Sequence, residues 1–142
     1  MRALLDVNVL IAALDAGHAH HGRVSAWLGS EAANGWASSP LTQNGCVRVM
    51  SLPAYPSPMP PSAVIARLRE AAQHPSHEFW PDDLSLLDET RIRGDRILGP
   101  RQVTDLYLLA LAVGRGGRLV TIDGRIALDA VAGAKPGHIV VL

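Results

Sequence analysis

The sequence predicts an α/β fold, with three layers in the order α/β/α and a mostly parallel sheet of four to five strands. Two observations support this prediction. Short apolar runs alternate with longer helical patterns along the chain, as is typical of parallel sheets with crossover helices. A length of 142 residues suits one domain with a core of its own, so residues 1–142 are expected to form a single domain.

The N-terminal half is expected to contain two strands and four helices. Ser38-Ser39-Pro40 is a helix-start signal, and Ser62 is expected to cap the last of these helices. The prolines of residues 53–61 exclude regular structure, because they lack a donor and fix φ. The strands are expected at 2–6 and 35–38, and the helices at 7–14, 19–33, 41–50 and 62–73.

The C-terminal half is expected to alternate in the same way. Residues 102–113 are apolar nearly all round and predict a buried helix, with Thr104 as its cap and Gly114 at its end. Residues 91–101 carry four arginines and two glycines and are expected to form an exposed, mobile loop. A short helix is expected at 84–90, and strands at 77–80, 118–122 and 138–142.

Composition excludes several classes of protein. Thirteen acidic residues balance 13 Lys and Arg residues, so the chain has no overall positive charge that would indicate a nucleic-acid binder. Any polyanion would have to be bound by a local group of residues. One cysteine excludes an intrachain disulfide framework. Asp6 and Asn8 interrupt the apolar start, which argues against a signal peptide, and no apolar stretch is long enough to span a membrane. A cytoplasmic protein is expected.

Three aspartates stand in apolar surroundings where packing alone would favour aliphatic residues. Asp6 and Asp123 follow predicted strands, and Asp105 lies in the first turn of the predicted buried helix. Each has an ordinary explanation alone: a helix start for Asp6 and Asp105, and a turn for Asp123 before Gly124. Residues at the carboxyl ends of parallel strands converge, however, so the three are expected to lie together.

Three converging carboxylates would repel one another in a low-dielectric site unless a cation lay between them. Hard oxygen ligands of this kind favour Mg²⁺, with Mn²⁺ as a second possibility. The sequence therefore predicts a divalent-metal site formed by Asp6, Asp105 and Asp123.

Four segments in this order resemble the PIN-domain family, and within it the VapC-type toxins of bacterial toxin–antitoxin systems. They are residues 4–11 around Asp6, 40–48 around Gln43, 104–108 around Asp105 and 119–123 ending at Asp123. The resemblance covers essentially the whole chain and implies a PIN-like domain.

The resemblance also implies a Mg²⁺-dependent endoribonuclease that cleaves structured RNA of the tRNA or rRNA class. Asp6, Asp105 and Asp123 would hold the metal and position the attacking water. Asn8, Thr104 and Thr121 would lie next to these acids without binding the metal. Asn8 and Thr121 would orient Asp6 and Asp123 by hydrogen bonds, although a helix-start role would also explain Asn8. A cognate VapB-like antitoxin and a homodimer are further expectations from this family.

One position departs from the family pattern. A glutamate commonly follows the threonine of the second segment, and this chain has Gln43 there. An amide can still hydrogen-bond or offer its oxygen to a cation, so Gln43 is included among the expected catalytic residues, but the site is expected to carry three formal charges. Weaker metal affinity and binding of one ion rather than two follow from this count.

Other motifs give weaker indications. Arg91, Arg93 and Arg96 are candidate RNA contacts, with a solvated loop as the competing interpretation. The spacing of the His18, His20 and His21 cluster does not suit a metal site on one helix face. No partner for Ser38 or Ser39 is evident that would indicate serine hydrolysis, and Trp36 and Trp80 are interpreted as core residues.

Two alternatives from other classes remain. The chain could be a PIN-fold module that binds RNA or protein with weak or no nuclease activity, because Gln43 replaces the usual glutamate. It could also be a phosphatase with Asp6 as nucleophile, but that chemistry requires a second aspartate two residues on, where this chain has Asn8.

Overall fold

A computed structural model describes residues 1–142 and contains one sheet of five strands, all of them parallel. The strand order is β3-β2-β1-β4-β5, so the N-terminal strand lies at the centre. The strands are β1 (Ala3–Leu5), β2 (Trp36–Ser38), β3 (His77–Phe79), β4 (Arg118–Thr121) and β5 (Ile139–Val141).

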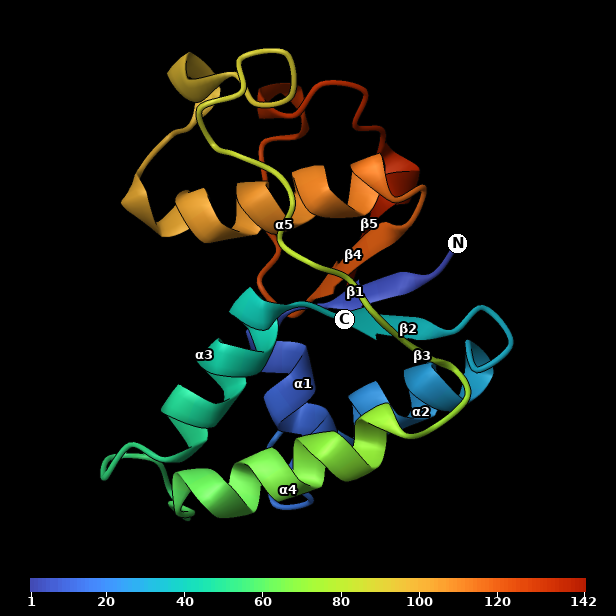
Figure 1. Ribbon diagram of the computed structural model, residues 1–142, viewed down its shortest axis with the longest axis vertical. Helices are drawn as coiled ribbons and strands as arrows, with labels where there is room; N and C mark the ends of the chain where they lie inside the picture. The colour runs from blue at the N-terminus through green and yellow to red at the C-terminus, as the bar shows by residue number, and fades with distance from the viewer.

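The helices cover both faces of this sheet (Figure 1). Helix α5 lies on one face, and the other four helices lie on the opposite face, which gives the three predicted layers. The helices are α1 (Val7–Leu14), α2 (His21–Ser30), α3 (Pro40–Met50), α4 (Pro61–Ala72) and α5 (Val103–Gly114). None of them has the length and apolar character that crossing a bilayer requires.

The alternation of side chains along the central strands explains these layers. Successive residues of a strand point to opposite faces of the sheet. Leu4 and Leu119 belong to the core that includes the apolar residues of α5, whereas Leu5 and Val120 pack with residues of α1, α3 and α4. The sheet is thus buried on both sides, as parallel sheets usually are.

Most predicted elements are confirmed, and the start of α3 follows the expected chemistry. Ser39 caps this helix in a reciprocal arrangement with Thr42: the Thr42 amide donates to the Ser39 hydroxyl, and the Ser39 amide donates to the Thr42 hydroxyl. Pro40 occupies the first helical turn, where its missing N–H costs nothing.

The two other predicted caps are wrong. Helix α4 begins at Pro61, so Ser62 lies inside its first turn and caps nothing. Thr104 does not cap α5, because the 3₁₀ turn Pro100–Gln102 continues directly into the helix and moves its start to Val103. Asp105 nevertheless lies in the first turn of α5, as predicted.

The helix predicted at 84–90 is also wrong. In this segment the Ser85 hydroxyl accepts the amide of Leu87, and the Asp88 carboxylate accepts the amide of Thr90. Such local bonds offer the backbone an alternative to helix. The following loop, 91–101, is exposed in large part, but it contains the 3₁₀ turn Gly94–Arg96, and Ile92 is fully buried.

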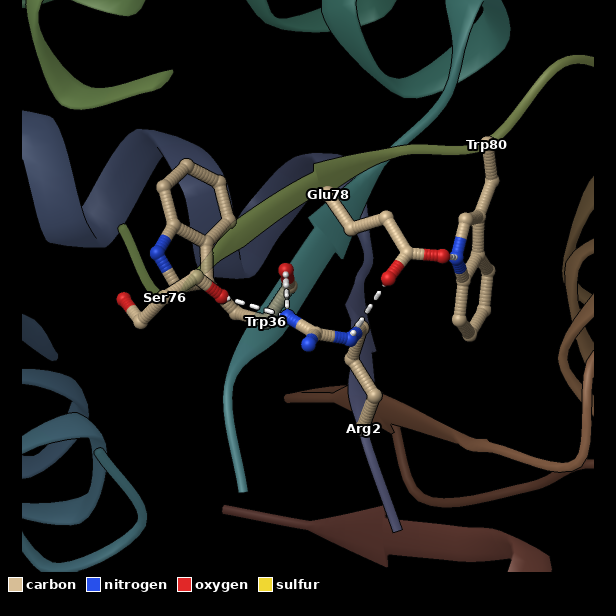
Figure 2. Close-up of polar contacts among 5 residues, drawn as sticks. All are labelled: Arg2, Trp36, Ser76, Glu78 and Trp80. Atoms are coloured by element: carbon tan, nitrogen blue, oxygen red, sulfur yellow. Dashed lines mark hydrogen bonds and ion pairs between the residues drawn. The ribbon is translucent and has the colours of Figure 1, made fainter. Parts of the chain in front are cut away.

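Arg2 joins the first three strands at the amino-terminal edge of the sheet. Figure 2 shows its guanidinium donating to the carbonyls of Ser76 (2.6 Å) and Trp36 (3.3 Å) and pairing with Glu78 at 3.2 Å. The other Glu78 oxygen accepts the indole N–H of Trp80 at 2.9 Å, which ties the buried Trp80 to the same group. One side chain therefore satisfies the carbonyl of Trp36 in β2 and that of Ser76, the residue before β3.

We expect Arg2→Ala to lower the free energy of unfolding by about 2 kcal/mol, because the short charge-assisted bond to Ser76 contributes about 1.5–3 kcal/mol, whereas the longer bond to Trp36 and the exposed ion pair add little. Urea denaturation monitored by circular dichroism measures this loss. Arg23→Ala, which removes an exposed arginine with no side-chain partner, is the matched control. A loss below about 0.5 kcal/mol for Arg2→Ala would show that the network does not hold the strands together.

Candidate active site

The pairing of β1 with β4 places two of the predicted site residues, Asp6 and Thr121, side by side. Leu5 pairs with Val120, and the Asp6 amide donates to the Val120 carbonyl at 3.0 Å. Asp6, the residue after β1, therefore lies next to Thr121, which ends β4. Asp6 is 5% exposed, so it is a nearly buried carboxylate at the carboxyl edge of the sheet.

Two groups hold the Asp6 carboxylate in one orientation. Its Oδ2 accepts the Thr121 hydroxyl at 2.8 Å, and its Oδ1 accepts the amide of Val7, the first residue of α1, at 2.7 Å. Asp6 thus caps α1. The same carboxylate is the one that the sequence predicts as a metal ligand.

Asn8 and Thr121 position Asp123 as well. The Asn8 amide donates to Asp123 Oδ2 at 3.3 Å, and its oxygen accepts the Ile122 amide at 3.4 Å. The Thr121 hydroxyl oxygen accepts the Asp123 amide at 3.1 Å. The supporting positions predicted for Asn8 and Thr121 therefore match the geometry.

Asp105 completes the group from the first turn of α5. A hollow of about 500 Å³, here called the carboxylate hollow, is lined by twelve residues that include all three aspartates. Asn8 and Thr104 also line it, from α1 and α5. The structure therefore brings together Asp6, Asp105 and Asp123 from three distant parts of the chain.

The electrostatics of the carboxylate hollow favour a cation. Burial, together with the charges of Asp6 and Asp123, raises the pKa of Asp105 to about 6. Burial also raises the pKa of Asp6, although its bonds from Thr121 and Val7 act in the opposite direction. No other side chain hydrogen-bonds the Asp105 carboxylate, so its oxygens have no partner within the protein.

The oxygen donors suit a hard divalent cation such as Mg²⁺ or Mn²⁺. No three His, Cys, Asp or Glu side chains are arranged so that one ion could contact all of them at once. Mg²⁺ does not need such a cage, because it is usually bound by one or two carboxylates, with water and phosphate oxygens completing its shell. The residues present therefore fit this kind of ion.

Gln43 is not brought to the carboxylates. Its amide nitrogen donates to the Ser38 hydroxyl at 2.9 Å, and its side chain lines a different hollow on the other side of α3. The residues of α3 that line the carboxylate hollow include Asn44, Gly45 and Arg48. The geometry thus gives no support to the expected catalytic role of Gln43, and sequence reasoning missed Asn44 and Arg48.

Gly45 explains how α3 comes so near the site. A Cβ atom at Gly45 would lie 2.6 Å from a methyl group of Val7, the residue after Asp6, so only glycine allows this approach. The position of α3 that packs against the start of α1 therefore has no side chain. Helix α3 supplies an amide and a guanidinium but no fourth carboxylate, in line with the expected count of three charges.

The three arginines predicted to contact RNA lie away from the carboxylate hollow. Arg91 lines a hollow at the C-terminal end of α5, whereas Asp105 is near its N-terminal end. Arg96 pairs with Asp129 at 2.8 Å, and Arg93 lines a separate surface hollow. Their contact with RNA stays a prediction without support from the site geometry.

Ser38 has a histidine partner that the sequence did not reveal. Its hydroxyl lies 2.8 Å from Nε2 of His77, which comes from the neighbouring strand 39 residues later. Ser38 is only 2% exposed, and no carboxylate orients His77, so this pair lacks the features of a hydrolase nucleophile. The histidine cluster is also accounted for: the ring of His18 accepts the His20 amide, and that of His21 contacts the Ala12 carbonyl.

Comparison with known proteins agrees with the fold. The family model described as PIN domain matches residues 3–133. Ribonuclease VapC44 of Mycobacterium tuberculosis is 51% identical over 142 residues, which is 100% of both chains. Ribonuclease VapC39 of the same organism is 42% identical over 134 residues, covering 94% of this chain and 96% of that protein.

A solved structure shares the fold. It is the crystal structure of VapBC2 from Rickettsia felis bound to a DNA fragment from their promoter. The matched chain has a TM-score of 0.58 and 16% sequence identity, and the match covers 87% of this chain and 89% of that one. At this identity the likeness shows the fold alone.

The raised pKa of Asp105 predicts how stability depends on pH when no divalent cation is added. Its folded pKa of about 6 exceeds the ordinary value of 3.8, so the folded state binds its proton more tightly, and stability falls as pH rises from about 4 to 6. Asp105→Asn removes this loss. We expect the variant to exceed the parent in Tm by a few °C at pH 7, and by less at pH 4, in EDTA.

Glu89→Gln, at an exposed position without partners, controls for the general loss of a negative charge. Added Mg²⁺ should raise the Tm of the parent protein and should have less effect on Asp105→Asn. An advantage of Asp105→Asn that is equal at both pH values would contradict the proposed repulsion.

The two faces of α3 predict opposite outcomes for two acidic substitutions. Asn44→Asp adds a fourth carboxylate to the carboxylate hollow and should tighten Mg²⁺ binding roughly tenfold. Gln43→Glu places its charge in the other hollow and should leave the affinity nearly unchanged. Isothermal titration with MgCl₂ and MnCl₂ measures both, and a larger gain for Gln43→Glu would mean that Gln43 faces the carboxylates.

Proposed function

The chain belongs to the PIN-domain family and, within it, to the VapC-type toxins, and from this premise we propose that it is a metal-dependent endoribonuclease. Its substrate would be structured RNA of the tRNA or rRNA class. A cognate VapB-like antitoxin would hold it inactive. The similar proteins from Mycobacterium tuberculosis are named ribonucleases, which supports the reaction type.

One observation carries the proposal more than any other. Asp6 lines one hollow at the carboxyl edge of the sheet together with Asp105 and Asp123, which follow it in the sequence by 99 and 117 residues. Such an edge is where ligands bind in open parallel sheets. Burial and mutual repulsion of the acids favour a cation there, and phosphodiester hydrolysis is a reaction that such a cation assists.

The residues of the site would have two kinds of role: some orient the aspartates, and the aspartates bind the metal ion. Thr121 and the Val7 amide fix the orientation of Asp6, and Asn8 with Thr121 fixes that of Asp123. Asp6, Asp105 and Asp123 would together hold Mg²⁺ or Mn²⁺, either through direct contact or through bound water. When bound, the ion would lower the pKa of a water molecule at the site and neutralise charge on the phosphate oxygens.

Substrate would be attracted locally rather than by the whole protein. The net charge is zero, and the three aspartates repel a phosphodiester until they are neutralised. Arg48 is the one basic residue among those that line the carboxylate hollow, and it is exposed. We assign to Arg48 the contact with an RNA phosphate next to the scissile bond, since guanidinium groups bind phosphate bidentately.

The protein would act with partners and in a defined compartment of the cell. The structural neighbour is a VapBC complex, which supports a VapB-type antitoxin as the partner of a chain with this fold. We further propose a homodimer that acts in the cytoplasm.

The alternative of a binding module with weak or no nuclease activity has less support. It rested on Gln43 replacing an acidic residue of the site, but Gln43 lies in another hollow, and the three aspartates form the group without it. A cleavage assay separates the two functions directly.

We expect purified protein to cleave a total tRNA and rRNA preparation in Mg²⁺ or Mn²⁺, and Asp6→Asn to reduce the rate at least a hundredfold, because it removes one of three charges that hold the ion. Thr121→Val leaves all three carboxylates but frees Asp6, and should reduce the rate about 10- to 100-fold. Denaturing gel electrophoresis with end-labelled RNA measures both.

Glu89→Gln serves as the matched control and should cleave like the parent protein. EDTA should abolish cleavage in every case. Cleavage by Asp6→Asn at the parent rate would refute the assignment of the site, and no cleavage of any RNA by folded parent protein in either metal would favour the binding module.

A further inference from the structure

Helix α3 separates the carboxylate hollow from a second one, which lies between α3, α4 and strand β2 and is here called the α3–α4 hollow. It has a volume of about 560 Å³, and its lining includes Trp36, Ser38, Gln43, Val47, Ile65 and Arg69. We propose that the α3–α4 hollow binds one unstacked nucleobase of the RNA, next to the phosphodiester that is cleaved. This inference rests on the proposed ribonuclease function and extends it to substrate binding.

The two hollows are neighbours across a single helix. Asn44 and Arg48, one turn apart on α3, line both of them. A strand whose phosphate lies over the carboxylates can therefore place its adjacent nucleotide across α3 without leaving the protein. Arg48, which lies between the hollows, can contact the linking phosphate.

Charge distinguishes the α3–α4 hollow from its neighbour. Its ten lining residues include two arginines, Arg48 and Arg69, and no acidic residue. Both arginines are exposed, and neither forms an ion pair within the protein. A polyanion is thus repelled by one hollow and attracted by the other, which would orient the RNA strand across α3.

A chain of hydrogen bonds holds the amide of Gln43, which lines the α3–α4 hollow. Burial lowers the pKa of His77, and the neutral ring can accept the Ser38 hydroxyl at Nε2, which lies 2.8 Å away. The Ser38 oxygen then accepts one amide hydrogen of Gln43. This sequence of donors leaves the second amide hydrogen and the carbonyl oxygen of Gln43 available to a ligand.

That pair suits the edge of a base. Every nucleobase carries a donor beside an acceptor, and unstacked RNA bases are read through such edges. The apolar walls suit its faces: Val47 and Ile65 border the hollow, and Trp36 offers an indole ring whose other neighbour is His77, at 4.4 Å between ring centroids. Trp80 is buried, whereas Trp36 is partly buried: it packs against the core, as predicted, and also lines the α3–α4 hollow.

The test uses the full chain in EDTA, which removes divalent cations. It follows the three indole N–H signals by NMR. The Trp36 signal is assigned with Trp36→Phe. The probes are the four nucleoside 5′-monophosphates, with ribose 5-phosphate as the ligand that lacks a base. We expect at least one nucleotide to shift the Trp36 signal at concentrations at which ribose 5-phosphate does not.

Gln43→Leu removes the amide at similar volume and should weaken nucleotide binding about tenfold, whereas Gln73→Leu, at an exposed position at the end of α4, should leave it unchanged. If Gln43→Leu does not fold, Ile65→Glu tests the same hollow, because Ile65 is 42% exposed and a negative charge there would repel a nucleotide. Equal shifts with ribose 5-phosphate, or parent affinity in the folded variant, would overturn the proposal.

Failure of this inference can be told apart from failure of the ribonuclease function. If RNA is cleaved and Gln43→Leu cleaves and binds like the parent, the base site is wrong and the nuclease stands. If nucleotides bind as described but no RNA is cleaved in Mg²⁺ or Mn²⁺, the nuclease is wrong and the base site remains.

Discussion

The pairing of β1 with β4 at the centre of the sheet is the constraint on which the site depends. Its register places Asp6 beside Thr121, and the bond between them lies at the carboxyl edge, where α1 and the turn to Asp123 begin. The sheet is buried on both faces, so a shift by one residue would turn Leu4 and Leu5 to the wrong cores. The packing of the two cores against the sheet therefore fixes the position of the Asp6 carboxylate.

The fold and the acidic residues of the site could be predicted because their signals are local. Apolar runs, helix starts and the aspartates that interrupt them are visible within a few residues. The position of Gln43 could not be predicted in the same way. Which face of α3 meets the carboxylates depends on the contact of Gly45 with Val7, a feature of tertiary packing that sequence spacing does not show. The helix expected at 84–90 failed because Ser85 and Asp88 bond the local backbone instead.

Helix α3 emerges as the element that gives the two hollows different chemistry. One face carries the small residue that lets α3 approach α1, and the adjacent face carries Gln43, held by Ser38 and His77. His77 belongs to β3 and Ser38 to β2, so the orientation of this amide depends on the sheet in the same way as that of Asp6. Both sites are therefore built on strands, while α3 divides them.

The central position of the N-terminal strand has a consequence for synthesis of the chain. Asp6 is synthesised before the hydroxyl that orients it, which lies 115 residues later in the chain. Until β4 has been made, one edge of β1 stays without its partner strand, and such non-local pairing forms slowly. The acidic group can assemble only after β4 has been made, so the nascent chain carries an unfinished site while the residues between β1 and β4 are synthesised.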